Sequence, residues 1–196
     1  MINYFEDYKL IAGCDEAGRG CLAGPVFAAA VILPIDCKIN DINDSKQLSE
    51  KKRYEIRDII LEKAIATGVA FVDNNQIDEI NILNASILAM HMALDKLIKT
   101  PEFILVDGNK FKNYKNIKHK CVVKGDSIYE NIAAASILAK TYRDDFMLRI
   151  DKEFPMYNWK QNKGYPTKQH IDAIFMHGKT KYHRQTFSVK KQTKLF

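Results

Sequence analysis

The sequence predicts an α/β protein in which helices flank one mixed central sheet. Short apolar runs, typical of buried strands, alternate with longer segments that space Leu and Ile as a helix does. Their order is strand, strand, helix, strand, helix, strand, strand and then helices, which predicts a sheet with helices on its faces. The chain has 196 residues, 46% of them hydrophobic, and this suits one sizeable domain.

The first half of the chain predicts a hairpin followed by a helix and a strand. Apolar residues 10–14 and 26–33 are the two hairpin strands, with a Gly-rich turn between them. A polar loop then leads to Ser49, which is placed to cap a helix that runs to about residue 66. Residues 68–72 form the third expected strand.

The second half predicts further helices and strands. Helical spacing covers residues 80–99, and the next expected strands are residues 103–107 and 120–123. The segment Ser127-Ile128-Tyr129-Glu130 matches a capping box and predicts the start of a long helix. A last helix is expected over residues 167–177.

Composition favours a cytoplasmic protein with reduced thiols. No run of about 18 apolar residues exists, so no transmembrane helix is expected. The first seven residues carry acids where a secretory signal would carry Lys or Arg. No Cys-x-x-Cys pair occurs, so no zinc site is expected; a Cys14–Cys21 redox switch is the alternative to ordinary thiols. The cysteines are Cys14, Cys21, Cys37 and Cys121.

Positive charge is concentrated at the C-terminal end. Residues 160–196 hold nine Lys or Arg against one acid, Asp172, so this segment carries +8 while residues 1–159 carry −2. A basic end on a near-neutral body suggests a polyanionic partner. A solvated lysine-rich surface explains the charge alone equally well.

Acidic residues stand at the ends of three expected strands. Asp15 and Glu16 follow the first strand, Asp107 ends the fourth and Asp126 comes shortly after the fifth. Each has an ordinary explanation: an exposed turn for Asp15-Glu16, an Asp-Gly turn for Asp107 and a helix cap for Asp126. Two neighbouring acids at the edge of an apolar core nevertheless repel each other unless a cation compensates.

Taken together, the four carboxylates predict a magnesium or manganese site. Oxygen ligands without a histidine or cysteine cluster suit Mg²⁺ or Mn²⁺, and two such ions roughly 4 Å apart can bind both reacting oxygens of a phosphodiester. Because neighbouring strand residues point to opposite faces, Asp15 and Glu16 are expected to converge only if Glu16 already lies in the turn. Gly18-Arg19-Gly20 would bring backbone amides and a guanidinium to a phosphate.

With these residues the chain resembles the bacterial ribonuclease HII (type 2 ribonuclease H) family over almost its whole length. The departure is Cys21, where the family usually has proline, and it should alter the stiffness of the turn more than its chemistry. The matching segments, in chain order, are Gly13 to Gly20, Gly24 to Val26, Asp44 to Leu48, Val106 to Gly108, Val123 to Ser127, Ala133 to Lys140, Gly164 to Thr167 and His183-Arg184.

The resemblance implies a ribonuclease H-like fold with a helical C-terminal extension. We expect a catalytic domain over residues 1–155, a basic helical region over 156–188 that packs on it, and a flexible tail over 189–196. The implied activity is endonucleolytic, two-metal-ion hydrolysis of RNA paired to DNA and of single ribonucleotides embedded in duplex DNA. It would leave 5′-phosphate and 3′-hydroxyl ends and remove misincorporated ribonucleotides and RNA primers.

The resemblance also implies roles for individual residues. The metal-binding catalytic carboxylates would be Asp15, Glu16, Asp107 and Asp126, with Asp15 bridging two Mg²⁺ or Mn²⁺ ions. The substrate-binding residues would be Gly18, Arg19 and Gly20 at the 2′-OH and scissile phosphate, Tyr165 against the adjacent sugar, and Lys46 at a phosphate.

Two of these residues keep ordinary alternatives. Tyr165 is a core aromatic residue in the alternative interpretation, although exposed loop aromatics often bind ligands. Lys46 is a plain surface lysine in its alternative interpretation.

The end of the chain resembles the short peptide by which replication proteins dock on the bacterial sliding clamp. It has the form Gln-x-x-Leu-Phe over Gln192–Phe196. Leu195 and Phe196 would fill an apolar pocket, and Gln192 would form a hydrogen bond beside it. An accidental lysine-rich end is the alternative. No membrane partner is expected, and a monomer is assumed.

Two other classes of function stay open at this point. A non-catalytic hybrid-binding protein would use only the basic end and the Gly-Arg-Gly turn, but four carboxylates repel a phosphate backbone unless a metal intervenes. A Mg²⁺-dependent phosphatase of small substrates would not need the basic C-terminal segment.

Overall fold

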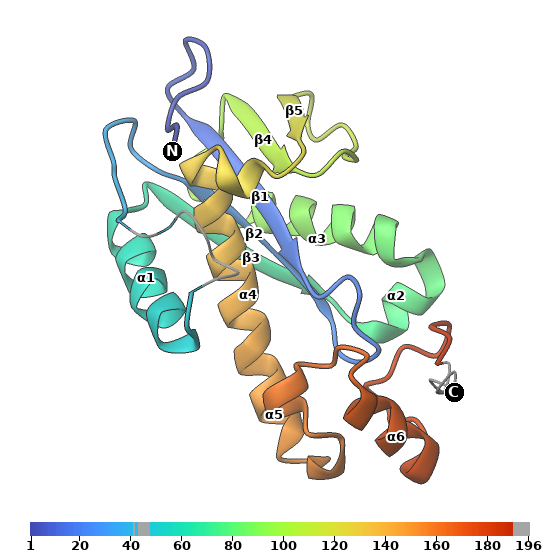
Figure 1. The fold of residues 1–196 in the computed structure, drawn as a ribbon. Coiled ribbons are helices and arrows are strands. Elements are labelled where there is room, and N and C mark those ends of the chain that lie inside the picture. The colour runs from blue at the N-terminus through green and yellow to red at the C-terminus, as the bar shows by residue number, and fades with distance from the viewer. Residues whose placement is uncertain (41, 43–47, 190–196) are drawn as a thin grey trace, which may run out of the picture.

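The computed structural model describes residues 1–40, 42 and 48–189, and these build a five-stranded mixed sheet with helices on both faces (Figure 1). The strand order is β3-β2-β1-β4-β5. β2 pairs antiparallel with β1 and β3, while β4 pairs parallel with β1 and β5. The predicted mixed α/β sheet and its leading hairpin are therefore confirmed. The strands are β1 (Ile11–Ala17), β2 (Val26–Ile32), β3 (Ala66–Val72), β4 (Phe103–Asp107) and β5 (Lys118–Val122).

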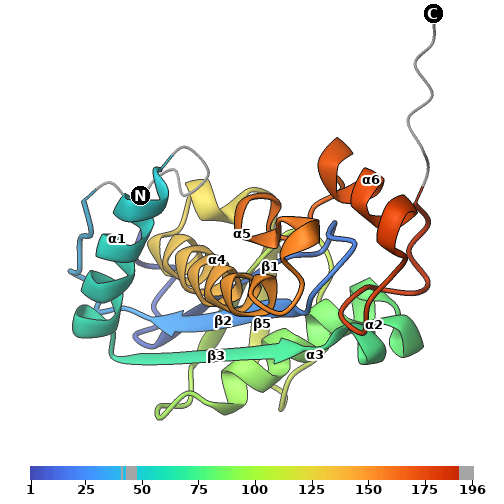
Figure 2. The same ribbon diagram turned by 90° about the horizontal axis from the view of Figure 1, so that it is seen from below.

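Figure 2 shows α3 on one side of the sheet and α1 and α4 on the other. The predicted helical C-terminal extension is present as α5 and α6, which follow α4 in the lower part of Figure 1. None of the helices in the described part of the chain is both long and apolar enough to cross a membrane. The helices are α1 (Glu50–Lys63), α2 (Asn74–Ile80), α3 (Ile82–Asp95), α4 (Glu130–Asp151), α5 (Trp159–Asn162) and α6 (Lys168–His177), with short 3₁₀ turns η2 (Gly125–Ser127) and η3 (Pro155–Tyr157).

Successive side chains of β2 point to opposite faces of the sheet and pack into two separate hydrophobic cores. Ala28 and Ala30 belong to a cluster with residues of α3, whereas Ala29 and Val31 belong to a cluster with residues of α4. Every residue of β2 is buried, as expected for a central strand with a helix layer on each face. The continuous apolar run that predicted this strand follows from its burial on both sides.

The register between β1 and β4 determines where their acidic residues lie. Cys14 is paired with Val106, and Asp15 and Asp107 each follow by one residue. Because the two strands are parallel and side chains alternate between faces, both aspartates leave neighbouring strands on the same face. Asp15 is also paired with Ala29 of β2, which identifies this face as the one that α4 covers.

The expectation that Glu16 lies in the turn is wrong. β1 continues through Ala17, and Glu16 is paired with Ala28 of β2. The strand extends this far because β2 continues alongside it, whereas its pairing with β4 stops at Cys14. Beyond that point one edge of β1 is open, and this open edge gives Glu16 access to the same space as Asp15.

The predicted capping box over residues 127–130 is also wrong. Ser127 belongs to η2, where its hydroxyl donates to the carbonyl of Lys124 at 2.7 Å. α4 begins only at Glu130, whose amide donates to the carbonyl of Ile2 at 3.0 Å. A contact with the N-terminal segment thus satisfies this helix end, and no local sequence pattern reveals such a contact.

The helix predicted over residues 80–99 is observed as α3, which covers Ile82–Asp95, and the helix α2 before it was not predicted; Asn81 separates the two. This residue has a φ of 65°, and its side-chain oxygen accepts hydrogen bonds from the amides of Leu83 and Asn84. A left-handed residue with a short polar side chain ends α2 and caps α3 at once. The cap predicted at Ser49 is confirmed, since its hydroxyl accepts a hydrogen bond from the first turn of α1.

β1 and α4 approach each other closely at Gly13. A Cβ at this position would lie 2.2 Å from the backbone carbon of Asn131 and 2.4 Å from the backbone nitrogen of Ile132. Since both neighbours are backbone atoms of a buried helix, they cannot move aside as a flexible side chain does. Glycine is therefore what allows α4 to lie on the strand that carries Asp15.

We expect Gly13→Ala to lower the free energy of unfolding by ~3 kcal/mol or more, because the added methyl group overlaps the backbone of α4. Gly20→Ala is the matched control, since a Cβ at Gly20 meets nothing within 4 Å. Urea unfolding of the two variants beside the wild type measures the difference. Equal stability of both variants would contradict the close approach of β1 and α4.

Candidate functional site

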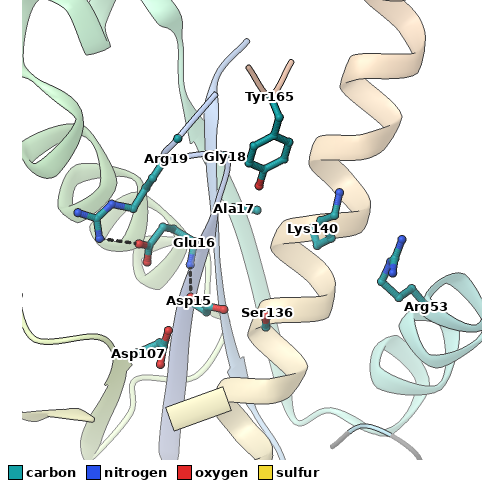
Figure 3. Close-up of a pocket in the computed structure, with 11 residues that line it drawn as sticks. Asp15, Glu16, Ala17, Gly18, Arg19, Arg53, Asp107, Ser136, Lys140 and Tyr165 are labelled. Carbon is teal, nitrogen blue, oxygen red and sulfur yellow. Dashed lines mark hydrogen bonds and ion pairs between the residues drawn. The ribbon is translucent and has the colours of Figure 1, made fainter. Parts of the chain in front are cut away.

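A pocket of about 520 Å³ opens where β1 and β4 end (Figure 3). Its carboxylates come from Asp15, Glu16 and Asp107, and Tyr165 lies toward the opposite end. The structure thus brings together residues that are far apart in the sequence and that the sequence analysis selected. The other lining residues come from the end of β1, the turn after it, α1 and α4, and they are Ala17, Gly18, Arg19, Gly20, Arg53, Ser136 and Lys140.

Hydrogen bonds fix the two aspartates of the pocket. Asp15 is only 6% exposed, and its Oδ1 accepts from the amide of Glu16 at 2.7 Å. Ser136 of α4 forms a further hydrogen bond with the Asp15 side chain. Asp107 Oδ1 accepts from the amide of Gly125 at 2.7 Å. The side chains are therefore oriented by the sheet, by α4 and by η2 together.

The electrostatics of the pocket oppose a full set of negative charges. Burial raises the pKa of Asp15 well above its ordinary value, and the charges of Glu16 and Asp107 raise it further. Burial also raises the pKa of Glu16, against the lowering effect of Arg19. The carboxylates are thus held in a cluster that costs free energy in the absence of a compensating cation.

Arg19 supplies part of that compensation. Its guanidinium donates to Glu16 Oε1 at 3.0 Å, as drawn in Figure 3. The Arg19 side chain is about half exposed, at 49%. The Arg19 guanidinium is therefore accessible to solvent, although the Glu16 side chain is largely buried, and an incoming anion can compete for the guanidinium.

Asp126 lies beside the pocket and is not among its lining residues. It follows Gly125 in η2, directly after the amide that holds Asp107. Among the residues that the structure describes, no three His, Cys, Asp or Glu side chains are already arranged to hold a metal ion. Three of the four predicted carboxylates meet in the pocket, and the fourth is on the adjacent turn.

The donor chemistry of the pocket fits a hard divalent cation. The lining residues offer carboxylate and hydroxyl oxygens and include no histidine or cysteine, which suits Mg²⁺ or Mn²⁺. A divalent ion would also relieve the repulsion that raises the pKa of Asp15.

The turn after β1 rests on a buried arginine. Gly18 has a φ of 98°, and a Cβ at this position would lie 2.0 Å from Nε of Arg143. The Arg143 guanidinium is fully buried and donates to three backbone carbonyls, those of Ala23, Pro25 and Lys163. The conformation and the close contact both require glycine, which explains why this residue type stands in the turn.

Tyr165 forms the far wall of the pocket and is 41% exposed. The guanidinium carbon of Arg143 lies 5.8 Å from the centre of its ring. Cys21, the residue that departs from the expected proline, is buried nearby, and its thiol donates to the carbonyl of Lys163 at 3.7 Å. All four cysteines are free thiols. The Cys21 side chain thus connects the turn after β1 with the loop of Tyr165.

Comparison with known proteins decides the family. The sequence model of the family described as Ribonuclease HII matches residues 12–190. The chain belongs to the ribonuclease HII family. Ribonuclease HII of Parabacteroides distasonis is 60% identical to it over 189 residues, which cover 96% of this chain and 95% of that protein. Membership of the ribonuclease HII family places the protein among the nucleases, which are hydrolases.

Solved structures agree with this assignment at the level of the fold. The structure of the PCNA:RNase HII complex from Archaeoglobus fulgidus is similar with a TM-score of 0.76 at 24% identity, covering 94% of this chain and 98% of that chain. The crystal structure of Bst-RNase HIII in complex with Mn²⁺ has a TM-score of 0.66 at 20% identity, covering 91% of this chain and 67% of that one. The ribonuclease HII chain thus has the expected fold.

Four residues of this ribonuclease HII pocket were not selected from the sequence as site residues. Ala17, Ser136 and Lys140 fall within segments that carry the family resemblance, and that was the signal that could have found them. Arg53 on α1 gave no signal. Lys140 donates to Asp144 at 2.5 Å, and burial lowers the pKa of Lys140. The wall formed by α1 and α4 therefore carries two basic side chains, of which Lys140 is already paired with an acid of its own helix.

Two predictions for this ribonuclease HII chain fall on residues outside the structure's description. Lys46, the expected phosphate contact, belongs to the segment 43–47, and Gln192–Phe196, the expected docking peptide, belongs to the segment 190–196. Both stay predictions from the sequence.

Proposed function

We propose that the protein is an endoribonuclease that cleaves RNA paired to DNA and single ribonucleotides embedded in duplex DNA. One observation carries the proposal: the carboxylates of Asp15, Glu16 and Asp107 share a pocket with the Gly-Arg-Gly turn and Tyr165. Groups suited to phosphodiester hydrolysis thus lie next to groups suited to recognising a sugar. The cellular role would be the removal of misincorporated ribonucleotides and RNA primers.

The acidic residues would hold the cofactor. Asp15, Glu16 and Asp107, joined by Asp126 from η2, would hold Mg²⁺ or Mn²⁺. When two such ions are bound, they supply positive charge that stabilises the attacking and leaving oxygens of an in-line displacement. The Mn²⁺ complex of the structural neighbour Bst-RNase HIII supports the use of a divalent ion.

The turn and Tyr165 would recognise the ribonucleotide. The 2′-OH distinguishes RNA from DNA at one position, and a glycine turn without bulky side chains permits close approach by backbone groups. Gly18 and Gly20 would contribute this approach, and Arg19 would bind the scissile phosphate in exchange for Glu16. Tyr165 would pack against the neighbouring sugar. The 2′-OH would be recognised and would not serve as the nucleophile.

Basic residues would position the duplex without reading its sequence. Lys140 and Arg53 line the pocket opposite the acids, and residues 160–196 carry a net charge of +8. Phosphate contacts of this kind supply affinity that is independent of sequence and sensitive to salt. Lys46 would add one such contact.

The proposed activity predicts a distinct substrate pattern. The protein should cleave a DNA duplex with one embedded ribonucleotide on the 5′ side of a phosphate, leaving 5′-phosphate and 3′-hydroxyl ends, and should leave an all-DNA duplex and a small phosphate ester intact. EDTA should abolish cleavage, and excess Mg²⁺ or Mn²⁺ should restore it. Gel analysis of end-labelled duplexes measures both. Binding without cleavage would favour the hybrid-binding alternative, and hydrolysis of the ester alone would favour a phosphatase.

We expect Asp15→Asn to lower kcat by roughly a thousandfold or more, because it removes about 4 kcal/mol or more of metal-dependent transition-state stabilisation. Duplex binding should survive. Mg²⁺ or Mn²⁺ should raise the Tm of the wild type but not of Asp15→Asn, because a ligand stabilises only a protein that binds it. Wild-type cleavage rates in a nuclease-free preparation of the variant would refute the role of Asp15.

We also propose that Gln192–Phe196 docks on the replication sliding clamp. The A. fulgidus structural neighbour is a PCNA:RNase HII complex, which supports an association of this kind. Deletion of residues 192–196 should weaken clamp binding at least about tenfold, because two apolar anchors are lost, and should leave cleavage in solution unchanged. Surface plasmon resonance on immobilised bacterial clamp measures the affinity. Equal affinity of both forms would eliminate docking by this peptide.

A further inference from the structure

We infer that His183 and Arg184 are a positioning pair that sets the spacing between the Gly-Arg-Gly turn and Tyr165. The inference rests on the proposed ribonuclease activity, in which these two elements hold the ribonucleotide from opposite sides. Neither residue lines the pocket, and both are completely buried. They follow α6 in a segment that returns to the catalytic core.

The backbone of this segment pairs with the residues that follow the turn. His183 forms a bridge with Ala23, and the Arg184 amide donates to the carbonyl of Leu22 at 2.9 Å. The amide of Leu22 in turn donates to the carbonyl of Gly164 at 2.8 Å. Residues 22–23 therefore lie between the segment of His183-Arg184 and the loop of Tyr165.

The Arg184 side chain holds the turn itself. Its Nη2 donates to the carbonyl of Gly18 at 2.6 Å, its Nη1 donates to that of Arg19 at 2.7 Å, and its Nε donates to that of Gly24 at 3.1 Å. All of these acceptors are backbone carbonyls. A planar guanidinium with several donors fixes their relative directions, which a lysine ammonium cannot do. Arg184 therefore determines the orientation of the turn from the buried side.

The His183 side chain reaches the Tyr165 loop through a second histidine. His183 Nδ1 accepts from the amide of Thr180 at 2.8 Å, so Nε2 carries the proton and donates to His170 Nε2 at 3.2 Å. His170 Nε2 also accepts from Trp159 Nε1 at 3.0 Å. The proton of His170 is therefore on Nδ1, which donates to the carbonyl of Tyr165 at 2.9 Å. The surroundings fix both tautomers.

Both histidines are neutral under ordinary conditions, as this arrangement requires. Burial lowers the pKa of His183 to about 3, with His170 and Lys179 adding to the effect. Burial also lowers the pKa of His170. A second proton on His170 would sit on Nε2 and face the N–H of His183 and of Trp159. A second proton on His183 would sit on Nδ1 and face the amide N–H of Thr180.

Two adjacent residues thus reach the two halves of the proposed ribose site. Arg184 binds the turn directly, and His183 acts on Tyr165 through His170. Gly18 and Tyr165 both line the pocket, as Figure 3 shows, and both lie near the buried Arg143 side chain. Since a misplacement of about 1 Å can cost on the order of a hundredfold in rate, this spacing matters for a substrate with a single ribonucleotide.

The test compares His183→Leu, which loses the hydrogen-bonding ring, with His183→Gln, whose amide can still donate to His170. On a duplex with one embedded ribonucleotide, we expect His183→Leu to lower kcat/KM at least about tenfold and His183→Gln to stay within about threefold of the wild type. In a Tyr165→Ala background, His183→Leu should have no further effect. Affinity for an all-DNA duplex should not change.

Arg184→Lys tests the contact with the Gly-Arg-Gly turn, since it keeps the charge and loses the planar set of donors. It should lower kcat/KM on the same substrate at least about tenfold at a temperature at which the variant is fully folded. Ile174→Val is the matched control, because Ile174 lies in the same buried cluster as Trp159 and bonds to neither element. It should lower Tm slightly and leave kcat/KM unchanged.

The outcomes separate this inference from the proposed function. No cleavage by the wild type would refute the function. Cleavage by the wild type, with His183→Leu losing the same factor whether or not Tyr165 is present, would overturn the inference and make His183 merely structural. If His183→Leu does not fold, Arg184→Lys decides. A normal kcat/KM for Arg184→Lys, whether or not this variant is less stable, would overturn the inference as well.

Discussion

The parallel pairing of β1 with β4 is the constraint on which the site depends. It brings Asp15 and Asp107, which are 92 positions apart, to the same face and the same level of the sheet. The pairing ends at Cys14–Val106, so both carboxylates lie at the first position where β1 and β4 are no longer paired with each other. α4 can cover this face closely only because Gly13 lets its backbone approach. The acidic cluster is therefore a consequence of strand register and of one glycine.

The free-energy cost of grouping these acids is countered by positively charged side chains nearby. Burial and then the charges of Glu16 and Asp107 raise the pKa of Asp15 in the pocket, while Arg143 and Arg184 carry buried positive charge beneath the adjacent turn. The two arginines donate to backbone carbonyls, and their charge is not consumed by a direct bond to the acids of the pocket. A site of this kind favours a ligand that brings cations and phosphate together, because each then meets charge of the opposite sign.

Much of the fold was accessible from the sequence because the local signals agreed with it. The strand at residues 103–107 has the predicted bounds, and Ser49 caps α1 as its position before a helical segment indicates. The errors arose where tertiary contacts replaced local ones. The start of α4 is satisfied by the carbonyl of Ile2, and β1 is extended to Ala17 by its pairing with β2. A single sequence shows neither partner.

The same distinction explains which residues of the site could be predicted from the sequence and which could not. Acids at strand ends, together with the family resemblance, were enough to select Asp15, Glu16 and Asp107, because strand ends meet at one edge of a sheet. Buried cations leave no such pattern. His183-Arg184 is among the segments that carry the family resemblance, but the role of Arg184 emerges only once its guanidinium is seen to bind the carbonyls of Gly18 and Arg19, 165 and more residues earlier in the chain. The groups that touch a substrate can thus be selected from residue type, whereas the groups that hold them in place are identified only by the hydrogen bonds they form.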